Sequence, residues 1–76
     1  MVAVASPTWL AQHPIHSLDD LTQRPLLHLS TRPDAWHHWF ASQHVMTERS
    51  YHGTRFETFP MLVRTAMAGG GVALVW

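Results

Sequence analysis

The sequence predicts a small α/β fold in which a mostly parallel sheet is flanked by helices. Short apolar segments of strand length alternate with segments of helical periodicity, in the order β-α-β-α-β-α-β. Apolar strands that alternate with helices are typical of a parallel sheet covered by helices. The 76 residues are enough for one domain at most.

The N-terminal part of the chain predicts a strand, a helical turn and a short helix. Val2–Ala5 is a valine-rich run, and Pro7 ends it because proline fixes its own φ and biases the preceding residue away from helix. Proline is comfortable at a first helical position, so Thr8–Gln12 is expected to form a short helical turn. Ser17 has the side chain of an N-cap for a second helix, which Arg24-Pro25 ends.

The middle of the chain predicts a second strand followed by an aromatic helix. Leu26–Leu29 is apolar, and the turn residues after it lead to Asp34, a good N-cap. Trp36, Trp39 and Phe40 follow at i, i+3 and i+4, so they share one face of the helix. A stripe of this kind is more often core packing than a binding surface. Whether Trp36, nearest the turn, faces a cleft stays open at this point.

The C-terminal part predicts a third strand, a helix and a last strand. Arg49–Phe59 alternates imperfectly, which indicates a strand with a turn or bulge near Gly53. An apolar stripe predicts a helix over Pro60–Ala68. Gly69–Gly71 then stops this helix, since glycine accepts the left-handed conformation of a C-cap. Val72–Val75 is apolar throughout and is expected to be a buried strand.

The composition excludes several functional classes. Five Lys and Arg balance five Asp and Glu, so there is no basic footprint for nucleic acid. No apolar run approaches the roughly 18–20 residues of a membrane-spanning helix. The chain has no cysteine, which removes disulfides and cysteine-ligated metal sites and fits a reducing cytoplasm.

Seven histidines raise the question of a metal site. His37 and His38 are adjacent and diverge by about 100° on a helix, whereas helical zinc pairs lie one turn apart. His13 and His16 have a suitable spacing, but Pro14 lies between them and no acidic residue completes a motif. The pattern therefore favours surface histidines. Hydrolase motifs and a P-loop lysine are also absent.

Polar groups follow the predicted strands at the positions where α/β folds bind ligands. Ser6, Ser30-Thr31 and Thr58-Phe59 each come at a strand end just ahead of a helical segment. In an open α/β sheet, ligands bind at the carboxyl ends of strands, where helix N-termini point. Small hydroxyls beside aromatic rings suit the binding of a small polar molecule and not its chemical conversion. Each residue taken singly is about equally well explained as a turn or cap residue.

The segments "VAVASPTWLA", "SLDDLTQRPLLHLSTRPDAWHHWF" and "RFETFPMLVRTAMAGGGVALVW" occur in this order and cover nearly the whole chain. Together they resemble the effector-binding domain of LysR-type transcriptional regulators, nearest to the branch typified by the glycine-cleavage-system activator. The resemblance implies a type 2 periplasmic-binding-protein fold, with two Rossmann-like α/β subdomains around an effector cleft. Residues 1–76 resemble a fragment of it, the second subdomain. The implied effector contacts are the cleft-facing strand ends: Ser6, Leu29, Ser30, Thr31, Phe59, Pro60 and Met61, with Trp36 as a further candidate.

The resemblance also implies the partners. It implies a small-molecule effector, no cofactor or metal, no catalysis, no membrane and a cytoplasmic location. DNA would be bound only through a winged helix-turn-helix domain that this chain lacks, in a full-length dimer or tetramer. Alone, the chain is expected to self-associate, because a lone subdomain exposes apolar surface. The alternative is a stand-alone small-molecule-binding or protein-interaction module without DNA binding.

Two positions depart from the family pattern. Pro60 stands where relatives often have a small polar residue that could cap the helix and touch the ligand. Proline has no N–H to donate, which weakens this contact. Trp76 stands where the family usually continues with proline.

Overall fold

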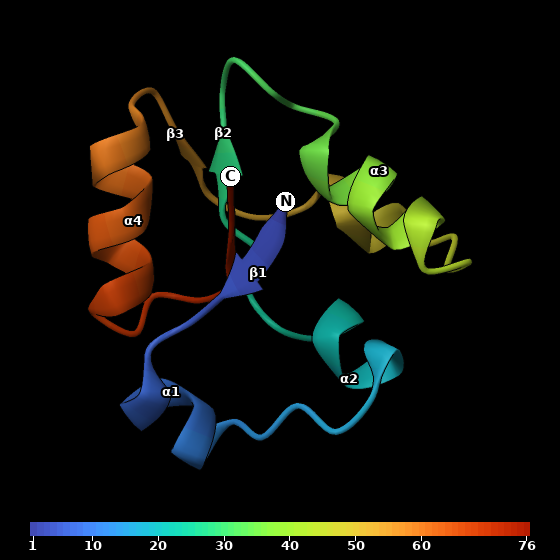
Figure 1. Cartoon of the computed structure of the whole chain (residues 1–76), viewed down its shortest axis with the longest axis horizontal. Coiled ribbons are helices and arrows are strands. Elements are labelled where there is room, and N and C mark those ends of the chain that lie inside the picture. The colour runs from blue at the N-terminus through green and yellow to red at the C-terminus, as the bar shows by residue number, and fades with distance from the viewer.

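The computed structural model describes residues 1–76 as an α/β unit with helices on both sides of short strands (Figure 1). Its elements are, in chain order, β1 (Val2–Val4), α1 (Pro7–Gln12), α2 (Leu18–Thr22), β2 (His28–Leu29), α3 (Ala35–Ser42), the 3₁₀ helix η1 (Glu48–Tyr51), β3 (Arg55–Phe56), α4 (Phe59–Met67) and β4 (Ala73–Val75). No helix is both long and apolar enough to cross a membrane.

The strands form two small sheets, which corrects the prediction of one mostly parallel sheet. β2 and β3 are parallel, whereas β1 and β4 are antiparallel, with Val2 opposite Val75. A single parallel bridge between Leu26 and Val72 connects the two pairs. Strands β2, β3 and β4 therefore run in one direction and β1 runs against them. An apolar run has the same pattern in either direction, so the sequence did not reveal the orientation of β1.

The predicted strand over residues 49–59 is reduced to two residues, and its first part forms a 3₁₀ helix instead. Thr47 accepts a hydrogen bond from the Arg49 N–H at 3.2 Å, and Ser50 Oγ donates to the Thr47 carbonyl at 2.9 Å. Such local bonds compete with a sheet ladder. Only Arg55–Phe56 pairs as strand β3, after the turn at Gly53.

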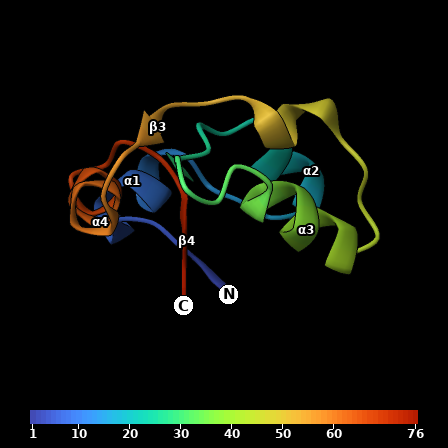
Figure 2. The same cartoon turned by 90° about the horizontal axis from the view of Figure 1, so that it is seen from above.

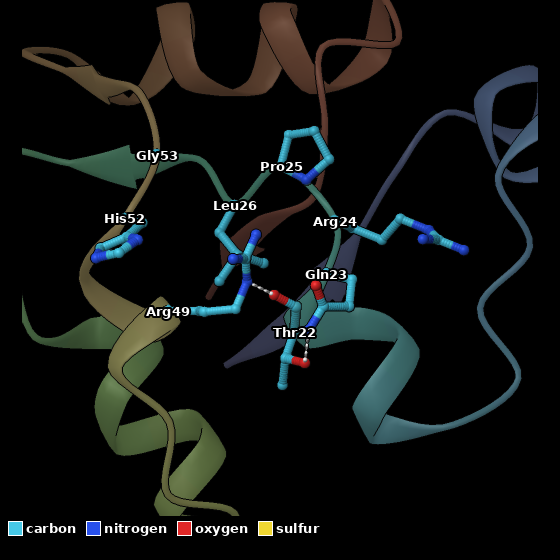
Figure 3. A pocket seen from close by; sticks show the side chains of 8 residues that line it. All are labelled: Thr22, Gln23, Arg24, Pro25, Leu26, Arg49, His52 and Gly53. Carbon is cyan, nitrogen blue, oxygen red and sulfur yellow. Dashed lines mark hydrogen bonds between the residues drawn. The ribbon is translucent and has the colours of Figure 1, made fainter.

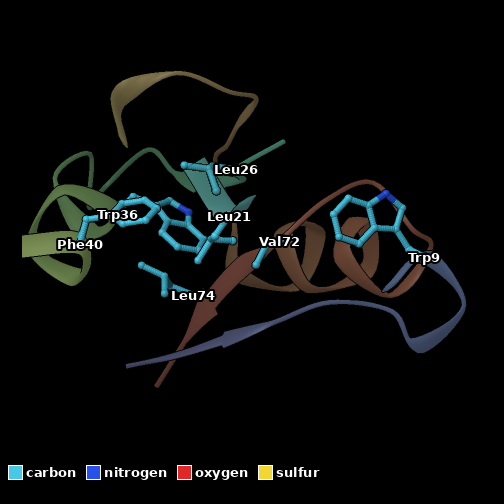
Figure 4. Close-up of a cluster of buried hydrophobic side chains, with 7 residues drawn as sticks. All are labelled: Trp9, Leu21, Leu26, Trp36, Phe40, Val72 and Leu74. Atoms are coloured by element: carbon cyan, nitrogen blue, oxygen red, sulfur yellow. The ribbon is translucent and has the colours of Figure 1, made fainter. Parts of the chain in front are cut away.

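Two apolar clusters hold the helices against opposite sides of the strands. Figure 2 shows α4 on one side of β4, and α2 and α3 on the other. The larger cluster is drawn in Figure 4 and comprises Trp9, Leu21, Leu26, Trp36, Phe40, Val72 and Leu74. The smaller cluster, under α4, comprises Leu27, Leu62, Ala66 and Ala73. Neighbours such as Leu26 and Leu27 thus belong to different layers, as expected for a buried strand with alternating side chains.

Three α-helices begin at hydroxyl caps. Ser6, Ser17 and Thr58 occupy the N-cap positions of α1, α2 and α4, and each side chain accepts a hydrogen bond from a first-turn N–H. Asp34 occupies the N-cap position of α3, but its side chain makes no cap hydrogen bond. The predicted N-cap position of Asp34 is therefore confirmed, but the side-chain hydrogen bond expected of a capping residue is not formed. Its φ of −99° and ψ of 6° depart from the extended geometry that capping favours.

The glycine run ends α4 as the sequence predicted. Gly69 has a φ of +85° and donates its N–H to the Ala66 carbonyl at 3.1 Å. Gly70 donates to the Thr65 carbonyl at 2.8 Å. These two bonds form a Schellman motif, which needs a left-handed residue after the cap. The chain then turns sharply into β4.

Candidate functional site

The carboxyl ends of three strands lie at one end of the molecule. Because β2, β3 and β4 run in one direction, their carboxyl ends lie together, and the amino end of antiparallel β1 joins them. Figure 1 shows the N- and C-termini at this end, with the connections from β2 to α3 and from β3 to α4. We call this region the carboxyl end. Helices α3 and α4 both begin there, so their first N–H groups lack intrahelical partners near this surface.

The turn after β2 places two hydroxyl groups at the carboxyl end. The Ser30 N–H donates to the Phe56 carbonyl of β3 at 2.8 Å, and the Arg32 N–H donates to the Leu29 carbonyl at 2.9 Å. These bonds fix the backbone of the turn. The side chains of Ser30 and Thr31 remain exposed, while Leu29 is partly buried against the smaller core cluster. The turn thus presents polar groups on a fixed backbone.

The start of α4 adds an apolar surface beside that turn. Phe59 is 39% exposed and Met61 is 54% exposed, and Pro60 is also at the surface. The ring of Phe59 lies 6.2 Å from the ring of Trp76, measured between centroids. Thr58 anchors the segment by accepting the Met61 N–H at 3.4 Å.

A pocket of about 290 Å³ opens at the carboxyl end. It is lined by residues from three segments, Met1, Thr31–Ala35 with His38, and Trp76. The Arg32 guanidinium carbon lies 4.6 Å from the centroid of the Trp76 ring, a cation–π distance. Sequence reasoning proposed neither Arg32 nor Trp76 as a contact. The available signal was the position of Arg32 directly after the Ser30-Thr31 pair.

Ser6 and Trp36 do not lie with the other candidates. Ser6 follows β1, whose antiparallel direction places it at the opposite end of the molecule. Its Oγ accepts the Trp9 N–H at 3.4 Å as a helix cap. Trp36 is 1% exposed, and its Nε1 donates to the Leu27 carbonyl at 2.9 Å. The structure thus brings together the residues that follow β2 and β3, but it does not bring Ser6 to the same end, although strand-end residues of a parallel sheet are expected to lie together.

The histidines do not converge on a metal geometry. The structure holds no group of three or more His, Cys, Asp or Glu side chains that could bind a metal ion. His37 instead stacks on Tyr51, with 5.3 Å between ring centroids. His28 departs from the surface pattern expected of the histidines, because it is only 3% exposed.

Burial of His28 disfavours the charged form of its ring. Its Nε2 lies 2.7 Å from the His52 carbonyl oxygen, so we assign the proton to Nε2. Burial lowers the pKa of His28 below the usual 6.5, the hydrogen bond to His52 raises it, and the charge of Arg55 lowers it further. The net direction is downward, because a buried imidazolium loses its hydration.

We expect the stability of the fold to decrease in acid because of His28. Its pKa is lower in the folded than in the unfolded chain, so the unfolded chain binds more protons as the pH falls below 6.5. The stability that neutral His28 contributes is fully present above pH 6.5. It is lost as the pH falls toward the lower pKa that His28 has in the folded chain. Urea unfolding of His28→Gln at several pH values should show a weaker pH dependence.

A control separates this effect from general destabilisation. Leu62→Ala removes a buried, non-titrating side chain, so it should lower stability without changing its pH dependence. An unchanged pH dependence in His28→Gln would show that His28 is not the responsible group.

The unit places polar turns and helix starts at the carboxyl ends of its strands, which is where open α/β sheets bind their ligands. Comparison with known families makes the assignment specific. The family model described as LysR substrate binding domain matches residues 1–76, and the chain belongs to this family. It is a family of transcriptional regulators and not of enzymes, as the sequence predicted.

Known relatives agree with this assignment. The chain is 44% identical over 71 residues to the HTH-type transcriptional regulator TrpI of Pseudomonas aeruginosa. It matches the solved effector-binding domain of AmpR from Citrobacter freundii with a TM-score of 0.76 and 29% identity, and a variant of that domain with three substitutions matches equally well. Each match covers 93% of this chain, but only 23% of TrpI and 34% of the AmpR chain. The chain thus spans about a quarter of the curated relative.

Proposed function

We propose that this chain supplies one wall of the effector site of a LysR-type regulator. In this proposal a small polar metabolite binds at the carboxyl end, against the hydroxyls of Ser30 and Thr31. The observation that carries the proposal is that β2, β3 and β4 all finish at this end, where α3 and α4 begin. Ligands of open α/β sheets bind at such places.

The groups at this end suit binding by hydrogen bonds and stacking. Ser30 and Thr31 each offer one donor and two acceptor sites, on a backbone fixed by the bond from Ser30 to Phe56. Phe59 offers an exposed aromatic face, and Arg32 offers a cation. Ser6 and Trp36 are left out of this proposed site, because one caps a helix at the far end and the other lies in the core.

The place of the chain in the complete regulator is also a proposal. We propose that residues 1–76 are the second of two subdomains, that the other subdomain closes the cleft, and that a separate helix-turn-helix domain binds DNA. The name of TrpI as a helix-turn-helix regulator supports this arrangement. Action as a dimer or tetramer, self-association of the isolated chain and a place near the glycine-cleavage activator remain predictions.

The test of this function uses paired hydroxyl deletions in the complete regulator. An effector is first identified by thermal-shift screening of a metabolite panel. Ser30→Ala combined with Thr31→Ala is then expected to weaken its binding about five- to 150-fold, since each of the two lost hydrogen bonds contributes about 0.5–1.5 kcal/mol. Isothermal titration calorimetry measures the change.

A matched double variant controls for the loss of exposed hydroxyls. Thr8→Ala with Ser42→Ala removes the same two groups from exposed positions on α1 and at the end of α3. Binding should stay within about twofold of the unchanged regulator. Equal affinity in both double variants would refute a role for Ser30 and Thr31.

A further inference from the structure

A second pocket lies at the other end of the fold, where β2 and β3 begin. It has a volume of about 200 Å³ and is formed by residues 22–26 together with Arg49, His52 and Gly53 (Figure 3). Two arginines and a histidine line it, and none of its lining residues is acidic. The chain as a whole has balanced Lys+Arg and Asp+Glu, so this pocket is a local concentration of positive charge.

Arg49 extends across this pocket, and only part of its guanidinium is hydrogen-bonded. Its Nε donates to the Thr22 carbonyl at 2.5 Å, which ties η1 to the end of α2. Figure 3 shows its side chain extending across the pocket to Thr22. The structure gives its two Nη atoms no partner within the chain. A guanidinium fixed through Nε and open at Nη is prepared to bind an oxyanion.

Arg24 adds charge without acting as the direct ligand. Its Nη2 donates to the Pro14 carbonyl at 2.8 Å, and its Nε is buried without a partner. Figure 3 shows its side chain turned away from Arg49. Because a cation near a partly enclosed pocket raises its potential, Arg24 strengthens the attraction for an anion.

The backbone at Gly53 lies close to that of Leu26, so the pocket is already formed without a ligand. A Cβ on Gly53 would lie 1.9 Å from the Leu26 carbonyl oxygen, so only glycine lets the two segments approach this closely. His52, the preceding residue, is further tied by its carbonyl to the buried ring of His28. The pocket would therefore lose little conformational freedom on binding, which favours affinity for a small ligand.

We propose that this pocket binds a small oxyanion, either inorganic phosphate or the carboxylate of a metabolite. The pocket is at the opposite end from Ser30 and Thr31, so the proposal is independent of the proposed effector site. The small volume and the neutral overall charge favour a small anion over a nucleic acid or a lipid surface.

The experiment titrates the ¹⁵N-labelled chain with inorganic phosphate and, separately, with acetate, at constant ionic strength set by sodium chloride. Saturable shifts are expected for the Gly53 amide and the Arg49 Nε–H resonance. The anion with the higher affinity identifies the chemistry that the pocket prefers. No saturable shift with either anion overturns the proposal.

Two matched glutamine-to-glutamate substitutions test the charge of the pocket. Gln23 and Gln43 are the C-cap residues of α2 and α3, and each donates to the hydroxyl of the preceding residue. Gln23→Glu places a carboxylate in the pocket and is expected to weaken binding about fivefold or more, while Gln43→Glu is expected to change it less than about twofold. Equal effects of the two variants would overturn a localised site.

A second pair of variants tests the guanidinium itself. Arg49→Gln should abolish the saturable shifts, whereas Arg64→Gln, on the exposed face of α4, should preserve them. If Arg49→Gln unfolds the chain, Gln23→Glu still tests the pocket, because it leaves the bond from Arg49 to Thr22 in place. Phosphate and acetate affinities that are unchanged in a folded Arg49→Gln would contradict the proposal.

Discussion

Trp36→Ala is expected to lower the free energy of unfolding by about 3–5 kcal/mol, the cost of deleting a large buried aromatic side chain. The indole is 1% exposed and packs on Phe40, with 5.5 Å between ring centroids. Its Nε1 also satisfies the Leu27 carbonyl, which would be left without this donor. At about 0.05–0.15 kcal/mol per residue, a chain of 76 residues has a net stability of about 4–11 kcal/mol, so the variant should lose a large part of its stability.

Trp39 provides the matched control on the same helix. It is only partly buried at the edge of the core cluster, and its side chain makes no hydrogen bond in the structure. Trp39→Ala should therefore cost clearly less in urea unfolding. Trp36→Phe separates the hydrogen bond from the packing, and it should cost about 1–3 kcal/mol. Equal losses for Trp36→Ala and Trp39→Ala would contradict the assignment of Trp36 to the core.

Gly53→Ala is expected to lower the stability by at least about 2–3 kcal/mol, the range of a strained backbone combined with a steric conflict. Gly53 has a φ of +128°, where a side chain is strained. The added Cβ would also lie 1.9 Å from the Leu26 carbonyl oxygen, so one of the two segments must move. The same movement should disturb the pairing of β2 with β3 and the second pocket.

Gly69→Ala is the control that separates backbone strain from the steric conflict at Gly53. Its φ is +85°, but a Cβ there would only touch the side chain of Trp9 at 3.7 Å, an ordinary contact. Gly69→Ala should therefore cost about 1 kcal/mol, the backbone part alone. A Gly53→Ala variant as stable as Gly69→Ala in thermal unfolding would show that the approach to Leu26 is not a real constraint.

Local patterns in the sequence predicted most of the elements. Apolar runs located the strands near residues 2–5, 26–29 and 72–75, and helical spacing located α3 and α4. The aromatic stripe of α3 was correctly interpreted as core packing. These features depend on residues close together in the chain, which is why a sequence pattern reveals them.

What the sequence did not reveal depends on contacts between distant residues. The orientation of β1 depends on its pairing with β4, more than sixty residues away, and it decides where Ser6 lies. The burial of His28 and the hydrogen bond of Trp36 likewise depend on tertiary neighbours. The pairing of Arg32 with Trp76 joins the turn after β2 to the residue that follows β4 and has no local signature.

The central claim is that the effector binds at the carboxyl end of β2, β3 and β4. A crystal structure of the complete regulator with its effector bound tests this claim most directly. We predict that a polar atom of the effector lies within hydrogen-bonding distance of the Ser30 or Thr31 hydroxyl. An effector bound beside Ser6, or one that makes no contact with the turn after β2, would contradict the account.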